Sequence, residues 1–171
     1  MRVGEKHYRT VWMEDDTVKM INQQPIPHRF EIIDLPTYKD TAEAISTMIV
    51  RGAGAIGASA GYGMAQVALQ APDGSGFMDF IERSAEVLRQ TRPTAQDLFY
   101  AINRVLAAVK ETGSVSAARQ AAVETAEEMA DANAAAGKAI GEHGATLIEN
   151  GTRVLTHCSA GWLAFVDWGS A

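Results

Sequence analysis

The chain has 171 residues, of which 47% are apolar, and its formal net charge at pH 7 is −6. This length is enough for the core of one ordinary domain. The negative charge disfavours a nucleic-acid-binding surface or an anionic-membrane anchor, because both need an extended positive potential. No apolar run approaches the ~20 residues that cross a bilayer, and the first residues hold no apolar signal core, so we expect a cytoplasmic protein without membrane contact.

The residue usage disfavours metal and disulfide sites. Cys158 is the single cysteine, so neither an intrachain disulfide nor a site with several thiolates can form. The four histidines are scattered along the chain and show no ligand spacing. We therefore expect no bound metal and no cofactor.

The N-terminal part predicts a small antiparallel sheet. Two β-prone runs, 8–13 and 17–21, flank the turn residues 14–16 and predict a hairpin. A third strand is predicted at 30–33, and Pro36 ends it before the first helix.

A bundle of helices is predicted to follow this sheet. Thr37 and Asp40 can form a capping box, and the apolar spacing after them predicts a first helix over 41–50. After a second, glycine-rich helix, apolar stripes predict three more, at 81–88, 98–109 and 116–147. The last of these is rich in alanine and other small residues, which favours close packing against neighbouring helices.

The segment from Val50 to Ala65 is the most informative part of the chain. It begins with an arginine and a glycine cluster and continues as a helix of small residues. The first N–H groups of a helix have no intrahelical partner and its N-terminus carries about half a positive charge, so this pattern favours a phosphate site. Arg51 would add a forked, permanently charged donor to the same phosphate.

The glycines of this segment also fit a dinucleotide site or close helix packing. Residues 52–57 match the G-x-G-x-x-G pattern of dinucleotide-binding folds, but that pattern is meaningful only between a strand and a helix. The preceding residues are predicted to be helical, which disfavours a dinucleotide site. The glycines could instead let two helices approach closely, and on the glycines alone this role is as well supported as an anion site.

The character of the sequence changes at Asn150, where residues 152–157 predict a buried strand that leads to Cys158. Ligands of α/β sheets bind at the carboxyl ends of strands. A parallel strand needs neighbours on both sides, so one strand cannot stand alone. We expect a sheet-plus-helical domain over 1–150 and the start of an α/β domain over 151–171, whose remainder lies outside this chain or on another polypeptide.

Five separated motifs resemble those of the methylthioribose-1-phosphate isomerase family, in the family's order. They are Arg9–Trp12, Glu31–Leu35, Arg51–Gly57, Arg92–Ala95 and Leu155–Cys158. The resemblance covers essentially the whole chain but only about the first half of a family member. It implies an α/β fold with a C-terminal Rossmann-like domain, and a homodimer. Ribose-1,5-bisphosphate isomerase and the regulatory subunits of the translation-initiation guanine-nucleotide exchange factor share this fold.

The resemblance also implies site residues. The family's phosphate-binding loop corresponds to Arg51, Gly52 and Ala53, its second phosphate arginine to Arg92, and its catalytic cysteine to Cys158. The family's catalytic aspartate lies in the C-terminal half, outside this chain. Without the resemblance, Arg92 would be interpreted as a solvated surface charge and Cys158 as a small buried apolar residue.

The function implied is that of an aldose–ketose isomerase. Its substrate would be 5-methylthioribose 1-phosphate, an intermediate of methionine salvage, or a close 5-deoxypentose 1-phosphate. The two arginines and the helix N-terminus would hold the phosphate, while Cys158 and the family's aspartate form an acid/base pair. The alternatives are a regulatory protein of the same fold that senses a sugar phosphate or nucleotide without converting it, and a helical interaction domain with solvated arginines.

Overall fold

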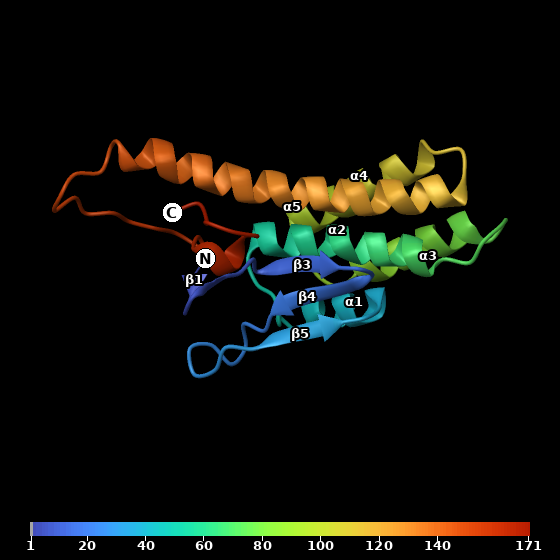
Figure 1. Ribbon diagram of the computed structural model, residues 1–171, viewed down its shortest axis with the longest axis horizontal. Coiled ribbons are helices and arrows are strands. Elements are labelled where there is room, and N and C mark those ends of the chain that lie inside the picture. The colour runs from blue at the N-terminus through green and yellow to red at the C-terminus, as the bar shows by residue number, and fades with distance from the viewer. Residues whose placement is uncertain (1) are drawn as a thin grey trace.

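The strands form two small antiparallel sheets in a computed structural model that describes residues 2–171 (Figure 1). The first sheet pairs β1 with β2, and the second has the order β3-β4-β5. Their bounds are Arg2–Val3, Lys6–His7, Val11–Glu14, Thr17–Ile21 and Ile32–Leu35. The three-stranded sheet confirms the sequence prediction, with its last strand two residues later than expected, whereas no sequence pattern indicates β1 and β2.

The hairpin between β3 and β4 has the turn that its sequence predicts. Glu14 pairs with Thr17, which leaves Asp15 and Asp16 as a two-residue loop. Asp15 adopts a φ of +56°, a left-handed conformation that aspartate tolerates in such loops. Local turn chemistry therefore sets the register of this hairpin.

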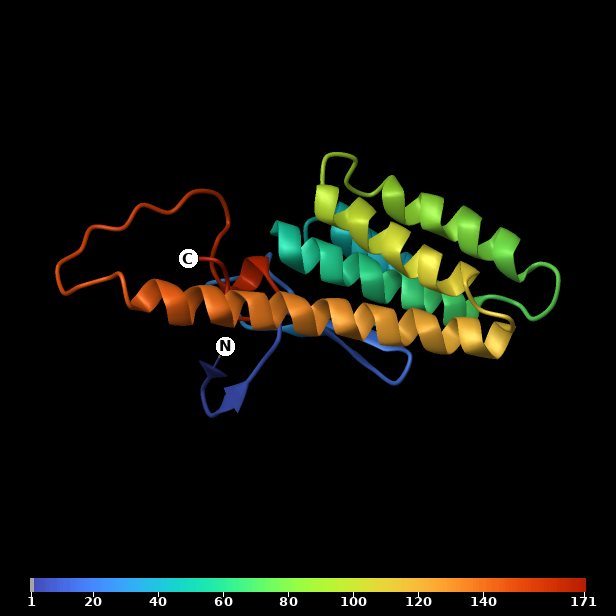
Figure 2. The same cartoon turned by 90° about the horizontal axis from the view of Figure 1, so that it is seen from above.

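Five α-helices follow among the described residues, and α2 contacts all of the others (Figure 2). Their bounds are Tyr38–Ser46 for α1, Ala53–Gln70 for α2, Phe77–Arg89 for α3, Gln96–Lys110 for α4 and Val115–Ala145 for α5, and a short 3-10 helix, η1, spans Trp162–Ala164. Figure 1 shows α2 between the three-stranded sheet and α5. No helix in residues 2–171 is both long enough and apolar enough to span a bilayer.

The central helix α2 can be enclosed by other elements because most of its side chains are small and apolar on every side of the helix. Residues 54–68 are all buried, which is the pattern of a helix enclosed by other elements. A Cβ atom added to Gly61 would lie 3.8 Å from Ala126 of α5, and one added to Gly57 would lie 3.0 Å from the Cβ of Asp97 in α4. The glycines therefore do serve close helix packing, one of the roles that their sequence pattern allows.

The first helix begins at the predicted cap. The Oγ1 of Thr37 accepts a hydrogen bond from the N–H of Asp40 (3.3 Å), and the N–H of Thr37 donates to Oδ2 of Asp40 (2.9 Å). This reciprocal pair is a capping box and satisfies two backbone donors that the helix itself leaves free. The prediction of the helix start is confirmed.

The same helix ends at Ser46, earlier than the predicted Val50. Met48 has a φ of +63°, and the N–H of Ile49 donates to the carbonyl of Ala44 over 2.9 Å. A left-handed residue followed by such a back-reaching bond is a Schellman motif, which stops a helix. The remaining residues lead to the start of α2 as a short link.

The apolar stripes of the later helices are confirmed. Of the positions that the spacing predicts in α3 and α4, Leu106 is only half-buried. The others are buried: Ile81, Ser84, Ala85, Leu88, Leu98, Ile102, Val105 and Val109. Helix α5 begins after Ser114, whose Oγ accepts from the N–H of Ala117 (3.2 Å). Its C-terminal end extends beyond the other helices (Figure 2).

The strand predicted over 152–157 is wrong for this structure. These residues are neither helix nor strand, and all are exposed. No strand of residues 2–171 lies beside them, so their backbone groups lack the two flanking partners that a parallel strand needs. The chain instead returns toward the N-terminus, where η1 and the last residues lie (Figure 1). A Rossmann-like domain that begins at 151 stays a prediction.

Candidate functional site

The predicted phosphate loop lies at the start of α2. Gly52 is the N-cap and has a φ of +94°, a conformation that glycine adopts without the strain that a Cβ brings. Its carbonyl accepts from the N–H of Ile56 (2.9 Å), so the first helical turn is formed. Arg51 and Ala53, on either side, are exposed. The first N–H groups of α2 are therefore next to an exposed guanidinium.

Arg51 lines a cavity of about 620 Å³ between the connection after β4 and the segment 159–164. This volume is in the range of small-molecule sites. The polar residues around Arg51 are Gln23, Arg29 and Ser159, and the apolar wall includes Trp162. Arg29 is paired with Glu31, whereas the Arg51 guanidinium forms no hydrogen bond or ion pair with residues 2–171, which leaves its charge available for an anion.

Cys158 lies beside this cavity without lining it. The residue is exposed and has a φ of +62°, an uncommon conformation for a residue with a Cβ. Its neighbour Ser159 does line the cavity. The exposure contradicts the interpretation of Cys158 as a buried apolar residue, and its predicted place at a strand end is wrong because no strand forms there.

Arg92 lies between α3 and α4 and is partly buried. Its Nη1 atom is buried and has no hydrogen-bond partner among the described residues, an arrangement that is costly for a charged group unless an anion is bound. Arg92 does not line the cavity at Arg51. The segment that follows Arg92 does reach α2, because Asp97 packs against Gly57. The interpretation of Arg92 as a freely solvated charge is therefore wrong for the Nη1 atom.

The segment after Cys158 packs directly on the phosphate loop. A Cβ atom added to Gly52 would lie 2.3 Å from the Cα of Ala164, and one added to Gly54 would lie 2.6 Å from the ring of Phe165. Gln23 connects the two sides, because its Nε2 donates to the carbonyl of Leu163 (2.7 Å) and lies 3.5 Å from the carbonyl oxygen of Arg51. The structure thus brings residues 51–54 and 163–165 together.

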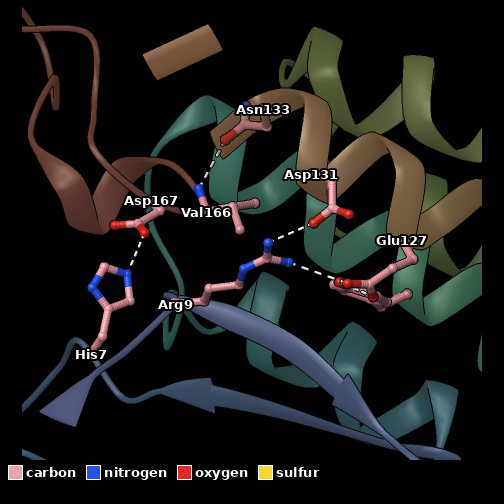
Figure 3. Close-up of polar contacts among 8 residues, drawn as sticks. His7, Arg9, Glu127, Asp131, Asn133, Val166 and Asp167 are labelled. Atoms are coloured by element: carbon pink, nitrogen blue, oxygen red, sulfur yellow. Dashed lines mark hydrogen bonds and ion pairs between the residues drawn. The ribbon is translucent and has the colours of Figure 1, made fainter. Parts of the chain in front are cut away.

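Three further contacts hold the same segment, and Figure 3 shows two of them, Asn133–Val166 and His7–Asp167. The N–H of Val166 donates to Oδ1 of Asn133 in α5 (2.9 Å), and the carbonyl of Val166 accepts from the N–H of Thr10 (2.9 Å). Next to them, Nε2 of His7 is hydrogen-bonded to Oδ2 of Asp167. Both backbone groups of Val166 are therefore satisfied by residues far away in the sequence.

Arg9 ties the start of the sheet to α5 (Figure 3). Its guanidinium forms ion pairs with Asp131 and, over 3.2 Å, with Glu127. Burial lowers the pKa of Arg9, but the hydrogen bond and charge of Asp131, together with the charge of Glu127, raise it more. Glu127 also accepts from the hydroxyl of Tyr62 in α2 (2.7 Å). Burial and this bond both raise the pKa of Tyr62, so the hydroxyl remains a donor.

The sequence prediction assigned no site role to Gln23, and it took Asn133 only as a helix-packing position. Asn133 interrupts the run from Ala132 to Ala136, and asparagine is a poorer helix former than alanine. That interruption is a signal that could have identified it. Gln23 follows a strand and carries no comparable signal, since its contacts come only from the folded chain.

The comparisons with known proteins place the chain in a family. The model of the initiation factor 2 subunit family matches residues 49–166. A methylthioribose-1-phosphate isomerase of Paramagnetospirillum magneticum is 42% identical over 100% of this chain and 48% of its own length, and one of Methylobacterium nodulans is 44% identical with the same coverage. The chain spans about half the length of the curated relatives it matches.

Two solved structures resemble the fold closely. The structure of 5-methylthioribose 1-phosphate isomerase from Pyrococcus horikoshii OT3 has a TM-score of 0.89 and 39% identity, over 96% of this chain and 47% of that one. The delta subunit of translation initiation factor eIF-2B from A. fulgidus has a TM-score of 0.86 and 36% identity, over 95% and 48%. The resemblance that the five motifs suggest is thereby confirmed, and the chain belongs to the initiation factor 2 subunit family.

Proposed function

We propose that this chain forms the phosphate-binding half of an aldose–ketose isomerase that converts 5-methylthioribose 1-phosphate, or a close 5-deoxypentose 1-phosphate, to the ketose. One observation supports this proposal most. The unpaired Arg51, which directly precedes the N-cap of α2, lines a cavity of about 620 Å³, in a chain that is 42% identical to a protein named for this reaction.

The phosphate is held by charge and by backbone donors. Arg51 supplies a forked guanidinium, and the N–H groups after Gly52 supply donors at the positive end of the α2 dipole. Arg92 is assigned to the same phosphate from the family resemblance; it precedes the segment that packs on α2 through Asp97, and its buried Nη1 has no hydrogen-bond partner among residues 2–171. Together these groups fix the phosphate end of the sugar.

The reaction moves one hydrogen from C2 of the sugar to C1. Because the anomeric oxygen carries the phosphate, the ring cannot open by itself as a free aldose does, and an acid/base pair must assist it. We assign one member of the pair to Cys158, whose neighbour Ser159 lines the cavity. The other member is an aspartate of the second half, in keeping with the relatives' greater length.

The complete functional unit is proposed to be larger than this chain. Its second half is Rossmann-like and begins near residue 151, and two copies of the whole form a homodimer in the cytoplasm. The coverage of only 48% of the related isomerase supports a second half. The homodimer follows from the family resemblance alone.

A sensor of sugar phosphates or nucleotides without turnover is the second candidate. The observation that favours it is the likeness to an initiation factor subunit, with a TM-score of 0.86. The exposed position of Cys158 beside the cavity is also compatible with binding without catalysis. The phosphate loop serves both functions.

The test is an NMR turnover assay on 5-methylthioribose 1-phosphate and its 5-deoxyribose analogue, made on the complete protein, with the presence of both halves confirmed by its intact mass. We expect ketose product, and a loss of about 10²-fold or more in kcat for Cys158→Ala, the usual contribution of a positioned acid/base group. Arg51→Gln should raise KM, whereas Arg83→Gln, at an exposed arginine of α3, should leave KM unchanged. Saturable binding without product would favour the sensor, and a Cys158→Ala rate within about threefold of wild type would contradict the catalytic role.

A further inference from the structure

The segment 160–167 is held in place by polar contacts from three separate parts of the chain. Thr10 acts twice, because its N–H donates to the carbonyl of Val166 (2.9 Å) and its Oγ1 donates to that of Trp162 (3.3 Å). Gln23 donates to the carbonyl of Leu163 (2.7 Å), and Asn133 accepts from the N–H of Val166 (2.9 Å). Such long-range bonds fix the segment relative to the body of the molecule.

Asn133 differs from the other residues that hold this segment, because it also touches the first turn of α2. Its Nδ2 atom lies 2.7 Å from where a Cβ of Gly54 would be, and its Oδ1 lies 3.2 Å from the same point. The other side of its carboxamide holds Val166. The side chain therefore lies between Gly54 of α2 and Val166, and Figure 3 shows its hydrogen bond to Val166.

The helix would be more stable with alanine at this position. Residues 132 and 134–136 are all alanine, and asparagine is a poorer helix former than alanine. One turn later, Gly137 leaves room for the carbonyl of Asp167, which is 3.0 Å from the place of its missing Cβ. The residues on this face of α5 therefore accommodate the segment 166–169 at the cost of some helix stability.

We propose that Asn133 is a positioning residue of the sugar-phosphate site. It fixes the segment that carries Cys158 and Ser159 against the first turn of α2. The groups that bind the phosphate and the acid/base group Cys158 can then act on the same sugar phosphate. Arg9 supports it, since this residue binds Asp131 in α5 while the adjacent Thr10 binds Val166. The inference rests on the proposed function, because it assigns both partners of Asn133 to one site.

The test compares Asn133→Ala with Asn133→Asp and with Asn103→Ala, which removes an exposed asparagine of α4. Alanine removes the acceptor of the Val166 N–H, so amide hydrogen exchange at Val166 should accelerate by about fivefold or more, as expected for one lost hydrogen bond. Aspartate keeps the acceptor and should retain slow exchange. Asn103→Ala should leave the exchange of Val166 at the wild-type rate.

The second readout is the affinity for inorganic phosphate, measured from the amide NMR shifts of residues 52–55. Asn133→Ala should weaken phosphate binding by about threefold or more. Without Asn133 the phosphate loop is less ordered in the free protein, and part of the binding free energy is then spent on ordering it. Asn103→Ala should bind as wild type does. A purely structural role of Asn133 would accelerate exchange and leave the phosphate affinity unchanged.

The outcomes separate this inference from the function on which it rests. Wild-type protein that shows no phosphate-dependent shift at residues 52–55 would overturn the proposed function and the positioning role together. A wild-type phosphate affinity that Asn133→Ala retains in full would overturn the positioning role alone. Unchanged exchange at Val166 in Asn133→Ala would also overturn it, because the contact would then carry no free energy.

Discussion

Gly52 is the single residue on which the geometry of the phosphate loop depends most. Its φ of +94° is strained for any residue with a Cβ, and a Cβ would lie 2.3 Å from the Cα of Ala164. We expect Gly52→Ala to lower the free energy of unfolding by about 2–4 kcal/mol, because backbone strain and overlap add. Urea denaturation monitored by circular dichroism measures this change.

Gly74→Ala is the matched control for that substitution. Gly74 has a similar φ of +87° but has nothing within 4 Å of an added Cβ. It should lose only the conformational part, about 1 kcal/mol. Equal losses at the two glycines would show that the contact between Gly52 and the segment 163–165 contributes nothing to stability.

Tyr62 is predicted to make stability pH-dependent in alkaline solution. Burial and the bond to Glu127 raise its pKa in the folded state, whereas an unfolded tyrosine titrates at about pH 10. The folded chain therefore keeps this proton where the unfolded chain loses it, so this contribution is present below about pH 10 and is lost as the pH rises further.

The comparison of wild type with Tyr62→Phe isolates this effect. The phenylalanine variant should show a flatter decline of unfolding free energy above about pH 10, with a slope difference that approaches 1.4 kcal/mol per pH unit. Urea titrations at successive pH values measure it. Tyr100→Phe, at an exposed tyrosine, should follow the wild-type profile, and parallel slopes for wild type and Tyr62→Phe would contradict the argument.

At the scale of one element, α2 offers a test of how its glycines set helix spacing. Gly61→Ala has ordinary contact distances, with Ala126 at 3.8 Å, so it should stabilise the protein by about 0.5–1 kcal/mol through helix propensity. Gly57→Ala would place a Cβ 3.0 Å from that of Asp97, and this crowding should cancel the gain. Thermal unfolding of both variants checks the difference, and an equal gain at both positions would mean that α4 simply shifts.

The elements that could be predicted from sequence are those with local signals. The capping box of Thr37 and Asp40 and the two-residue turn at Asp15 involve neighbours within a few residues, so their patterns suffice. The strand at 152–157 could not be judged in this way, because a parallel strand depends on partners elsewhere in the fold. Its two apolar residues, Val154 and Leu155, do not provide such partners.

The candidate site also has one part that local sequence predicts and one part that depends on residues far apart in the chain. Arg51, Gly52 and Ala53 are contiguous, and their pattern of charge, glycine and helix start predicts an anion site from local sequence alone. The contacts of Gln23 and Asn133 join residues that are 140 and 33 positions apart. Only the packing of α5 and the returning segment against α2 creates them.

At the scale of the whole molecule, the end formed by the last turns of α5 and the segment 146–157 is much less enclosed than the rest. The large apolar side chains exposed there are Ile140, Leu147, Ile148, Val154 and Leu155. Exposed apolar groups gathered in one region are typical of an interaction surface. We expect the proposed second half to cover this end, since the chain spans about half the length of its relatives.

Limited trypsin digestion tests how the returning segment is held. Arg153 lies in an exposed stretch, 152–157, without helix or strand, and such stretches are the preferred sites of proteolysis. We expect the first cut after Arg153. We also expect the fragment 154–171 to stay bound under native conditions, because Trp162, Ala164 and Val166 are buried and the backbone of Val166 is bonded on both sides.

Gel filtration of the nicked protein followed by mass spectrometry measures both points, and Arg153→Gln is the control that should delay the first cut. The fragment should leave the body only in denaturant, because its contacts extend to three parts of the chain and are lost together. Asn133→Ala should let it dissociate more readily, while Asn103→Ala should not. Release of the fragment from the wild-type protein in buffer would mean that the segment depends on covalent linkage through 146–157, and that its contacts with Thr10, Gln23 and Asn133 are too weak to position it.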